Sequence, residues 1–490
     1  MTSPIGIRFV GVASKAAGVP LAEKTTPTTL PMDRAGAGTK PTHPNLILAI
    51  CCMSLLVVGM DVTIVNVALP AIQHDLRATV SGLQWILDAY TLVVASLLML
   101  AGSISDRVGR RRVFQFGLLL FTAGSLLCSL AHSISQLVAF RALQGLGASM
   151  LNPVALSIIA NAFPEPRARA RAVGVWGAVA GASLALGPLI GGALTQSVGW
   201  RSIFWINLPI CLTAVVLAAR FVPESKAPRA RGFDPVGQLL VVVGLASLTY
   251  AVIEGPHAGW HSARILGLFA ASGAALALFL FYEPRLKQPL LDLRFFHSVP
   301  FSSATLLAVC AFASFAGFLF LNALYLQEVR GLSAFHTGLC TLPLAVAMMV
   351  CAPLSGRLVA HYGPRPSLLA AGAGFLLSAG MLTGLSVSTP IVFIMVVYVL
   401  FGVGLGMVNP AITNNAVAGM PLSQAGVAAA GTVVTGSRAK GTDFTQATHP
   451  IWWIMTGCGA VVLLLGWAST TAWAHASTER VAALLGHSGR

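Results

Sequence analysis

Three ionisable side chains, Asp61, Asp88 and Arg141, lie inside long apolar stretches of the sequence. A charge at the centre of a lipid bilayer costs on the order of 3 kcal/mol or more, so such a residue usually has a function. At a rise of about 1.5 Å per residue, Asp61 lies roughly 13 Å from one end of its apolar run. By the same count Asp88 and Arg141 lie roughly 9 Å from the corresponding ends of theirs. Two carboxylates and a guanidinium at similar depth predict a proton-binding site.

The chemistry of these groups suggests a role for each. Burial favours the neutral form of a carboxylic acid and a nearby arginine favours the charged form, so a conformational change that alters either influence can move a proton. We expect Asp61 to be the principal proton carrier and Arg141 to tune it. Asp88 is expected to be a second carrier or the partner of a cationic substrate. The alternative is a fixed ion pair that only sets the register of the helices.

The composition indicates a polytopic membrane protein. Of the 490 residues, 56% are hydrophobic and 9% are charged, whereas soluble domains carry about 25% charged residues. The basic residues behind the net charge of +15 sit in short loops rather than on one helix face, which argues against nucleic-acid binding. The eight cysteines lie within or at the edges of apolar runs, with no spacing typical of disulfides or metal ligands.

Neither an enzyme nor an ATP-driven motor is indicated. The sequence has no Walker A glycine loop, which leaves an ion gradient or simple facilitation as the driving force. No Ser/His/Asp set or metal cluster is visible, so we expect no catalytic site, metal or cofactor. Glu254, His257 and His261 fall in an expected outer loop, and we expect them to be solvated there.

The apolar runs divide the chain into spans of roughly 20 residues, the length that crosses a bilayer as a helix. The predicted spans are 45–70, 82–104, 112–131, 136–161, 171–195, 202–222, 236–254, 264–282, 299–327, 335–359, 366–387, 389–414 and 450–474, with a weaker one at 424–436. The weak run rises only about 20 Å against a hydrocarbon core of about 30 Å. This weak run, 424–436, is span 13 in chain order and is therefore expected to be shortened. Either it draws in flanking residues, or it fails to cross the membrane and leaves the C-terminus outside.

Basic connections between the spans define the expected domains. These are a cytosolic disordered tail (1–44), an N-terminal six-span half (45–222), basic linkers with two additional spans (223–298), a C-terminal half (299–474) and a C-terminal tail (475–490). A misassigned start codon upstream of Pro44 explains the first segment equally well.

A polar loop, residues 102–113, follows the second span and is too charged to lie in lipid. Lysine and arginine concentrate here and after the other even-numbered spans, so the positive-inside rule places this side and the N-terminus in the cytoplasm. Asp106 ends its helix, where the helix dipole disfavours an acid, so Arg110, Arg111 or the N-terminus of a helix in the other half should hold it. We expect a cytoplasmic gate made of Gly102, Asp106, Arg107, Gly109, Arg110 and Arg111.

Two motifs recur at nearly one offset, which indicates a parallel duplication of six-span halves. The run 355–365 repeats the glycine spacing of the polar loop, and 402–410 echoes 145–153. By this offset Asp61, Asp88 and Arg141 correspond to Phe315, Leu342 and Tyr398, so proton handling is expected in the N-terminal half alone.

Aromatic residues of the second half suit planar or cationic compounds. We expect an apolar substrate wall formed by Phe315, Phe318, Tyr325 and Tyr398, with ordinary helix packing as the alternative.

These motifs resemble the major facilitator superfamily, and within it the fourteen-span drug:proton antiporters of the EmrB and QacA type. The polar loop resembles the superfamily's motif after the second span, 141–148 its fourth-span motif and 177–192 the fifth-span motif that marks exporters. The runs 60–70 and 200–209 resemble signatures of the fourteen-span group, and 253–260 resembles actinomycete antibiotic-resistance exporters.

The resemblance implies the major facilitator fold, with two parallel-repeat six-span halves and two extra spans between them. It also implies particular site residues. The glycine motif Gly181, Gly187, Pro188, Gly191 and Gly192 should allow close helix approach and form a pivot or seal, with static packing as the alternative. Asn66 and Gln144 come from the first- and fourth-span motifs and complete the expected substrate cavity.

The function implied by the resemblance is secondary active multidrug or antibiotic efflux by proton antiport across the bacterial cytoplasmic (inner) membrane. The proton motive force replaces a cofactor, the substrates are small amphipathic or cationic molecules, and the protein is a monomer in the lipid bilayer. The alternatives are an exporter or facilitator of an endogenous lipid, siderophore or metabolite, and an impaired paralogue with a sensor or interaction role.

Overall fold

The computed structural model describes residues 43–227, 234–286, 293–415 and 444–471, together with Ala474 and Ser477. The regular structure of these residues is helical, and all of it belongs to one contact unit, Pro41–Arg490. Within the described part of the chain, 13 helical segments are long and apolar enough to cross a membrane. The predicted all-α polytopic membrane fold is therefore confirmed.

The first six spans follow the predicted ranges closely. They are α1 (Pro44–Leu76), α2 (Val80–Val108), α3 (Arg110–Ser129), α4 (Ile134–Ala162), α5 (Pro166–Ser197) and a sixth span divided into α6 (Ser202–Trp205) and α7 (Asn207–Phe221).

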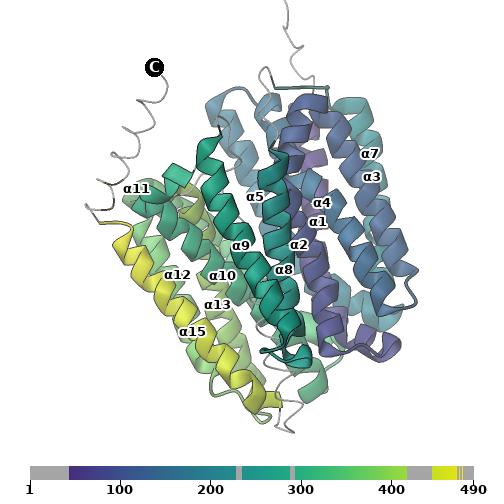
Figure 1. Cartoon of the computed structure of the whole chain (residues 1–490), viewed down its shortest axis with the longest axis vertical. Helices are drawn as coiled ribbons and strands as arrows, with labels where there is room; N and C mark the ends of the chain where they lie inside the picture. Colours follow the sequence, from purple (N-terminus) through teal and green to yellow (C-terminus); the bar gives the residue numbers. More distant parts are fainter. Residues whose placement is uncertain are drawn as a thin grey trace, which may run out of the picture. The chain divides into compact units, whose positions relative to one another are not determined.

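The two additional spans are α8 (Pro235–Ala258), which lies beside α2, and α9 (Ala263–Tyr282), which packs against α8 (Figure 1). Short 3₁₀ turns, η1 (Glu283–Arg285) and η2 (Leu293–His297), follow them. The remaining spans are α10 (Val299–Leu324) with its π-helical extension η3 (Tyr325–Val329), α11 (Ala334–Tyr362), α12 (Arg365–Leu382), α13 (Ile391–Asn415) and α15 (Phe444–Ala468). The weak span predicted at 424–436 lies outside the described residues, as do most of the two predicted tails.

Side-chain caps fix where several helices begin. The hydroxyl of Thr79 accepts from the backbone N–H of Gly82 at 3.1 Å before α2, and Ser133 accepts from that of Gln136 at 3.3 Å before α4. Asp234 caps α8 in the same way. Each cap satisfies one of the N–H groups that a helix N-terminus leaves without an intrahelical partner. These boundaries are therefore set by local sequence.

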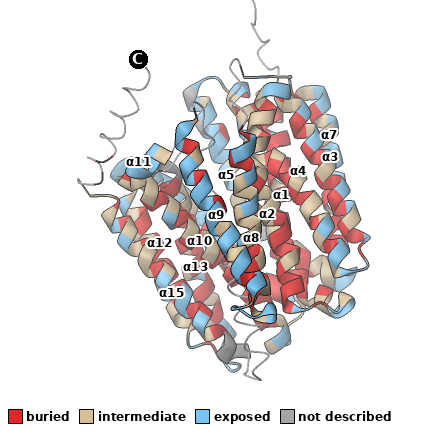
Figure 2. Ribbon diagram, in the orientation of Figure 1, coloured by how far each residue is buried: buried red, intermediate tan, exposed pale blue. Residues whose placement is uncertain are grey.

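The centre of the packing is α1, which is buried along most of its length and contacts α4, α5 and α7 as well as α10. A helix that is apolar on all sides is expected to be surrounded by protein. In contrast, α9 exposes apolar side chains along much of its length (Figure 2), as a lipid-facing helix does. Contacts between α5 and α11 join the two predicted halves, whose exact boundaries stay a prediction.

Charged and aromatic side chains tie three turns together where α1 ends. Asp75 accepts from the indole N–H of Trp200 at 2.9 Å and from Arg201 at 2.7 Å. The same guanidinium donates to the carbonyl of Ala131 at 3.0 Å, so the turns after α1, α3 and α5 are linked. We call this the Asp75 end of the helices; the opposite end, where α2 finishes, is the Asp106 end.

Glycines bring α5 close to α1 and α11 at the Asp75 end. A Cβ atom on Gly191 would lie 2.6 Å from the Ile64 side chain, and one on Gly187 would overlap Thr63. A Cβ on Gly192 or Gly338 would overlap the backbone of the facing helix. Gly181 makes only ordinary contact, 3.7 Å from its nearest neighbour. Close helix approach is thus observed at three of the four predicted glycines, whereas their role in transport stays a prediction.

Adding one methyl group tests this close approach. We expect Gly338→Ala to lower the stability of the purified protein by about 1–3 kcal/mol, because the carbonyl of Pro188 must move. Gly356→Ala, in the same helix α11, is the control, since no described atom lies within 4 Å of its added Cβ. Thermal unfolding in detergent measures both variants. Equal melting temperatures would contradict the close contact between α5 and α11.

Candidate functional site

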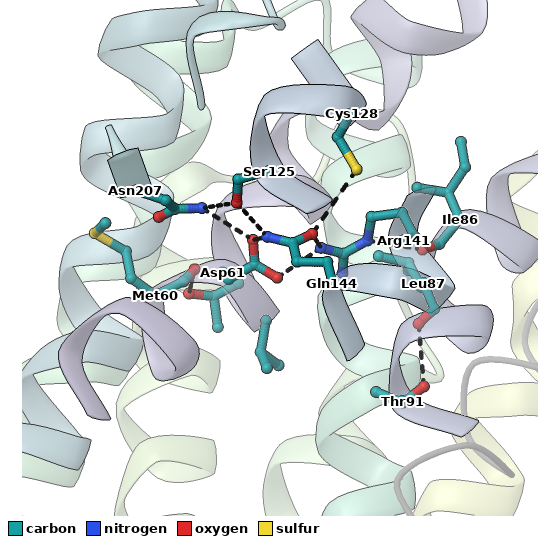
Figure 3. A network of polar contacts seen from close by, with 12 residues as sticks. Met60, Asp61, Ile86, Leu87, Thr91, Ser125, Cys128, Arg141, Gln144 and Asn207 are labelled. Atoms are coloured by element: carbon teal, nitrogen blue, oxygen red, sulfur yellow. Dashed lines mark hydrogen bonds and ion pairs between the residues drawn. The ribbon is translucent and has the colours of Figure 1, made fainter. Parts of the chain in front are cut away.

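An ion pair is buried between α1 and α4. The Nη1 atom of Arg141 lies 2.6 Å from Oδ2 of Asp61, and their side chains are 1% and 0% exposed (Figure 3). Taking two charges out of water costs several kcal/mol for each, which only close pairing and further hydrogen bonds offset. The structure therefore brings together the two groups that the sequence placed at similar depth.

Gln144 completes the pair from α4. Its amide nitrogen donates to Oδ1 of Asp61 at 2.9 Å, while its amide oxygen accepts from Arg141 at 2.6 Å. The nitrogen also donates to the hydroxyl of Ser125 at 2.7 Å. The sequence assigned Gln144 to the substrate cavity; in the structure it is fully buried within the network around the Asp61–Arg141 pair, and a role in binding substrate stays a prediction.

Two network members were not predicted from the sequence. Asn207, at the start of α7, donates to Ser125 at 3.1 Å and more distantly to Asp61 at 3.4 Å. Ser125 on α3 accepts from both amides, so side chains of α1, α3, α4 and α7 form one hydrogen-bonded network. A usable signal existed for Asn207, because it lies in the 200–209 motif, whereas a serine in an apolar helix carries no such signal.

The backbone and an aromatic ring hold the guanidinium of Arg141 from the side of α2. Its Nε atom donates to the carbonyl of Ile86 at 3.1 Å, and its Cζ atom lies 4.3 Å from the centre of the Tyr90 ring. A Cβ on Gly145 would lie 2.6 Å from the Tyr90 carbonyl oxygen, so a glycine is needed for α2 and α4 to approach this closely. The cation is therefore held in place by groups of α2 as well as by Asp61.

Asp88 is separate from this network. Its side chain is 1% exposed, and within the described part of the chain neither carboxylate oxygen has a hydrogen-bond partner. A buried carboxylate without a partner is costly in its charged form. Its roles as a second proton carrier or as the partner of a cationic substrate stay predictions.

The aromatic residues proposed as a substrate wall are buried. Phe318 stacks on Phe401 with ring centres 4.6 Å apart and meets Tyr398 edge to face at 5.1 Å. Tyr398 donates to Asn322, and Tyr325 donates to a carbonyl of the turn after α12. Phe315 is also buried, and Asn66 donates to the carbonyl one turn before it. Their contacts are those of helix packing, and a role in binding substrate stays a prediction.

The polar loop between α2 and α3 is held by two acids. Asp106 pairs with Arg110 at 2.9 Å, one of the three partners expected for it. Glu224, which the sequence did not single out, accepts from the backbone N–H of Arg111 at 3.0 Å at the start of α3. Gly109 has φ +129°, and a Cβ there would lie 2.7 Å from the Glu224 carboxylate. The gate residues thus meet the segment that follows α7.

Other predicted gate residues take ordinary helix positions. Gly102 lies within α2, and Arg107 is in its last turn, where a cation suits the helix dipole. No group of three His, Cys, Asp or Glu side chains within the described ranges is placed to hold a metal ion.

Thirteen apolar helical segments and a charge network buried among them define a multi-pass membrane protein of the transporter class. The chain belongs to the Major Facilitator Superfamily, whose family model matches residues 51–439.

Characterised relatives are similar over most of the chain. Multidrug resistance protein Stp of Mycobacterium tuberculosis is 37% identical over 390 residues, covering 80% of this chain and 72% of Stp. The tetracenomycin C resistance and export protein of Streptomyces glaucescens is 39% identical, covering 79% of this chain and 72% of that protein. The multidrug efflux pump LfrA of Mycolicibacterium smegmatis is 34% identical, covering 83% of this chain and 82% of LfrA.

A solved structure shares the fold. The human organic anion transporter MFSD10 (TETRAN) superposes with a TM-score of 0.59 at 15% identity, covering 86% of this chain and 99% of that one.

Removing the charge of Asp106 tests the gate. Asp106→Asn keeps the side-chain shape but loses the ion pair with Arg110, so we expect normal membrane insertion and efflux lowered about two- to fivefold, as for a partly exposed pair. Membrane-fraction yield and dye efflux from cells measure the two effects. Glu165→Gln, an exposed acid before α5, is the control. Loss of insertion in Asp106→Asn would instead show a purely topological role.

Proposed function

We propose that this protein exports drug-like small molecules in exchange for protons across the bacterial cytoplasmic membrane. The observation that carries the proposal is the buried Asp61–Arg141 ion pair, in a chain whose relatives are named for multidrug resistance and antibiotic export. A transporter of this kind performs no covalent chemistry and needs no cofactor beyond the proton motive force.

Protonation of Asp61 is the proposed coupling step. The charged carboxylate attracts Arg141 and accepts from Gln144, which draws α1 towards α4. Once a proton binds, the attraction to the guanidinium is lost, and Arg141 retains the oxygens of Gln144 and Ile86 as acceptors. Proton arrival therefore loosens α1 from α4, and proton departure draws them together.

The contacts of α5 support one state of an alternating-access cycle. At the Asp75 end, Gly192 and Gly338 lie against the facing helix. At the Asp106 end, no described atom lies within 4 Å of a Cβ added to Gly174 or Gly177. Because the arginine-rich loops favour the cytoplasm, these contacts support an inward-facing state, in which substrate enters from the cell interior.

The same rule orients the whole chain, with a cytoplasmic N-terminus. One chain carries the proton network and the proposed aromatic cavity, so a monomer is sufficient. The substrates are small amphipathic or cationic molecules, and Asp88 supports the cationic class because its buried carboxylate lacks a partner among the described residues.

Neutralising Asp61 tests proton coupling directly. We expect Asp61→Asn to abolish substrate-driven proton release from proteoliposomes, because an amide cannot take up the proton. Glu165→Gln should release protons as the wild type does. Unchanged coupling in Asp61→Asn would exclude it as the carrier. Wild-type efflux that ignores an uncoupler would favour a facilitator, and a wild type that moves no dye, antibiotic, lipid or siderophore would favour an impaired sensor.

Asp88 is tested by comparing substrates of different charge. We expect Asp88→Asn to reduce export of cationic dyes about tenfold or more, the size of a lost charge-assisted contact, and to leave export of neutral compounds nearly unchanged. Efflux rates of matched cationic and neutral fluorophores measure this. Equal loss for both classes, with fewer protons released per substrate, would instead make Asp88 a second proton carrier.

A further inference from the structure

The two additional spans are attached to the transport helices through α8. Polar side chains link α8 to α2 at two levels: Gln238 donates to the carbonyl of Ser96, and the indole N–H of Trp85 donates to Oε1 of Glu254 at 3.0 Å. The Trp85 ring also packs on Tyr250, with ring centres 5.5 Å apart. Hydrogen bonds at two levels fix both the height and the rotation of α2 against α8.

Glu254 was expected in a solvated loop, and that expectation is wrong. The residue lies in the last turns of α8, which continues to Ala258, and its side chain is only partly exposed. The apolar run ends at this residue but the helix continues, and Trp85 from α2 supplies a hydrogen-bond donor for the acid.

The turn of α2 that Glu254 holds is the turn that serves the proton site. Trp85 directly precedes Ile86, whose carbonyl accepts from Arg141. Asp88 is three residues further on, so it neighbours Trp85 along the helix surface. Tyr90, which lies under the guanidinium, completes the same segment. A shift of this turn would therefore move Arg141 relative to Asp61.

We propose that Glu254 is a positioning residue: through Trp85 it fixes the α2 turn that supports Arg141, and the α8–α9 hairpin thereby sets the proton affinity of Asp61. This inference rests on the proposed role of Asp61 as proton carrier.

The surrounding groups give the sign of the effect. The charged or titratable groups that act on the Asp61 site are Arg141 from α4, Tyr90 from α2, Cys128 from α3 and Cys211 from α7. Around Glu254, the other such groups are Tyr250 on its own helix, with Arg264 of α9 over the Tyr250 ring, and the exposed His257 and His261. Arg141 is the cation paired with Asp61. Loosening its support weakens the preference of Asp61 for the charged form, so protons bind at higher pH.

Two substitutions of Glu254 separate the hydrogen bond from the charge. Glu254→Gln keeps an acceptor for the Trp85 indole and should leave the pH profile of substrate-driven proton release unchanged. Glu254→Ala removes the acceptor and should move the half-maximal pH upwards by about 0.5–1 pH unit, the size expected for one hydrogen bond. His261→Ala, an exposed residue near the same end of α8, is the matched control.

Trp85→Phe provides a second route to the same result. It keeps an aromatic ring against Tyr250 but removes the indole N–H, so it should reproduce the upward shift even if Glu254→Ala fails to fold. Wild-type pH profiles in both Glu254→Ala and Trp85→Phe would overturn the inference, as would an equal shift in Glu254→Gln. Asp61→Asn is measured in parallel. Proton release by that variant would overturn the proposed role of Asp61 as carrier. If Asp61→Asn releases no protons while the Glu254 variants keep the wild-type half-maximal pH, only the proposed role of α8 is overturned.

Discussion

Placing a charge in an apolar interior requires a matched partner, and the pairing of Asp61 with Arg141 organises the N-terminal helices. The carboxylate takes bonds from α4 and, more weakly, from α7, while the guanidinium is held by a carbonyl and a ring of α2. A buried pair contributes little net stability, but removing one partner leaves an uncompensated charge that costs about 3–5 kcal/mol. Protonation of Asp61, the proposed coupling step, would remove one of these charges and so change how the helices are held together.

The two ends of these helices are secured by charges of a different kind. At the Asp75 end one carboxylate holds Trp200 and Arg201, and at the Asp106 end Glu224 holds the first turn of α3. These pairs are partly exposed, so each contributes roughly 1 kcal/mol or less and can form and break during a cycle. The buried pair has no such freedom while it remains charged. The partly exposed pairs at the helix ends therefore differ from the buried Asp61–Arg141 pair, which is the proposed switch.

The sequence predicts the helices well because about 20 apolar residues per span is a strong constraint, and it predicts that Asp61 and Arg141 lie at similar depth. It does not show which way side chains point around each helix. Asp88 shares that depth but takes no part in the network, and Gln144 and Asn207 join it. Glu224 and Glu254 were missed for another reason: each acid is satisfied by donors far away in the sequence, Arg111 and Trp85. Periodicity carries no information about such partners.

The comparison of the two halves gives a physical reason for assigning the proposed proton response to one of them. At the position that repeats Arg141, the second half has Tyr398, whose hydroxyl donates to Asn322 in a neutral hydrogen bond between α13 and α10. Neither the tyrosine nor the asparagine changes charge in the physiological pH range, so this contact is the same at any proton concentration. Phe315, in place of Asp61, is a buried side chain without an ionisable group. In the proposed cycle, a proton arriving from outside alters the α1–α4 contact and leaves the α10–α13 contact unchanged, and this difference would convert proton binding into relative movement of helices.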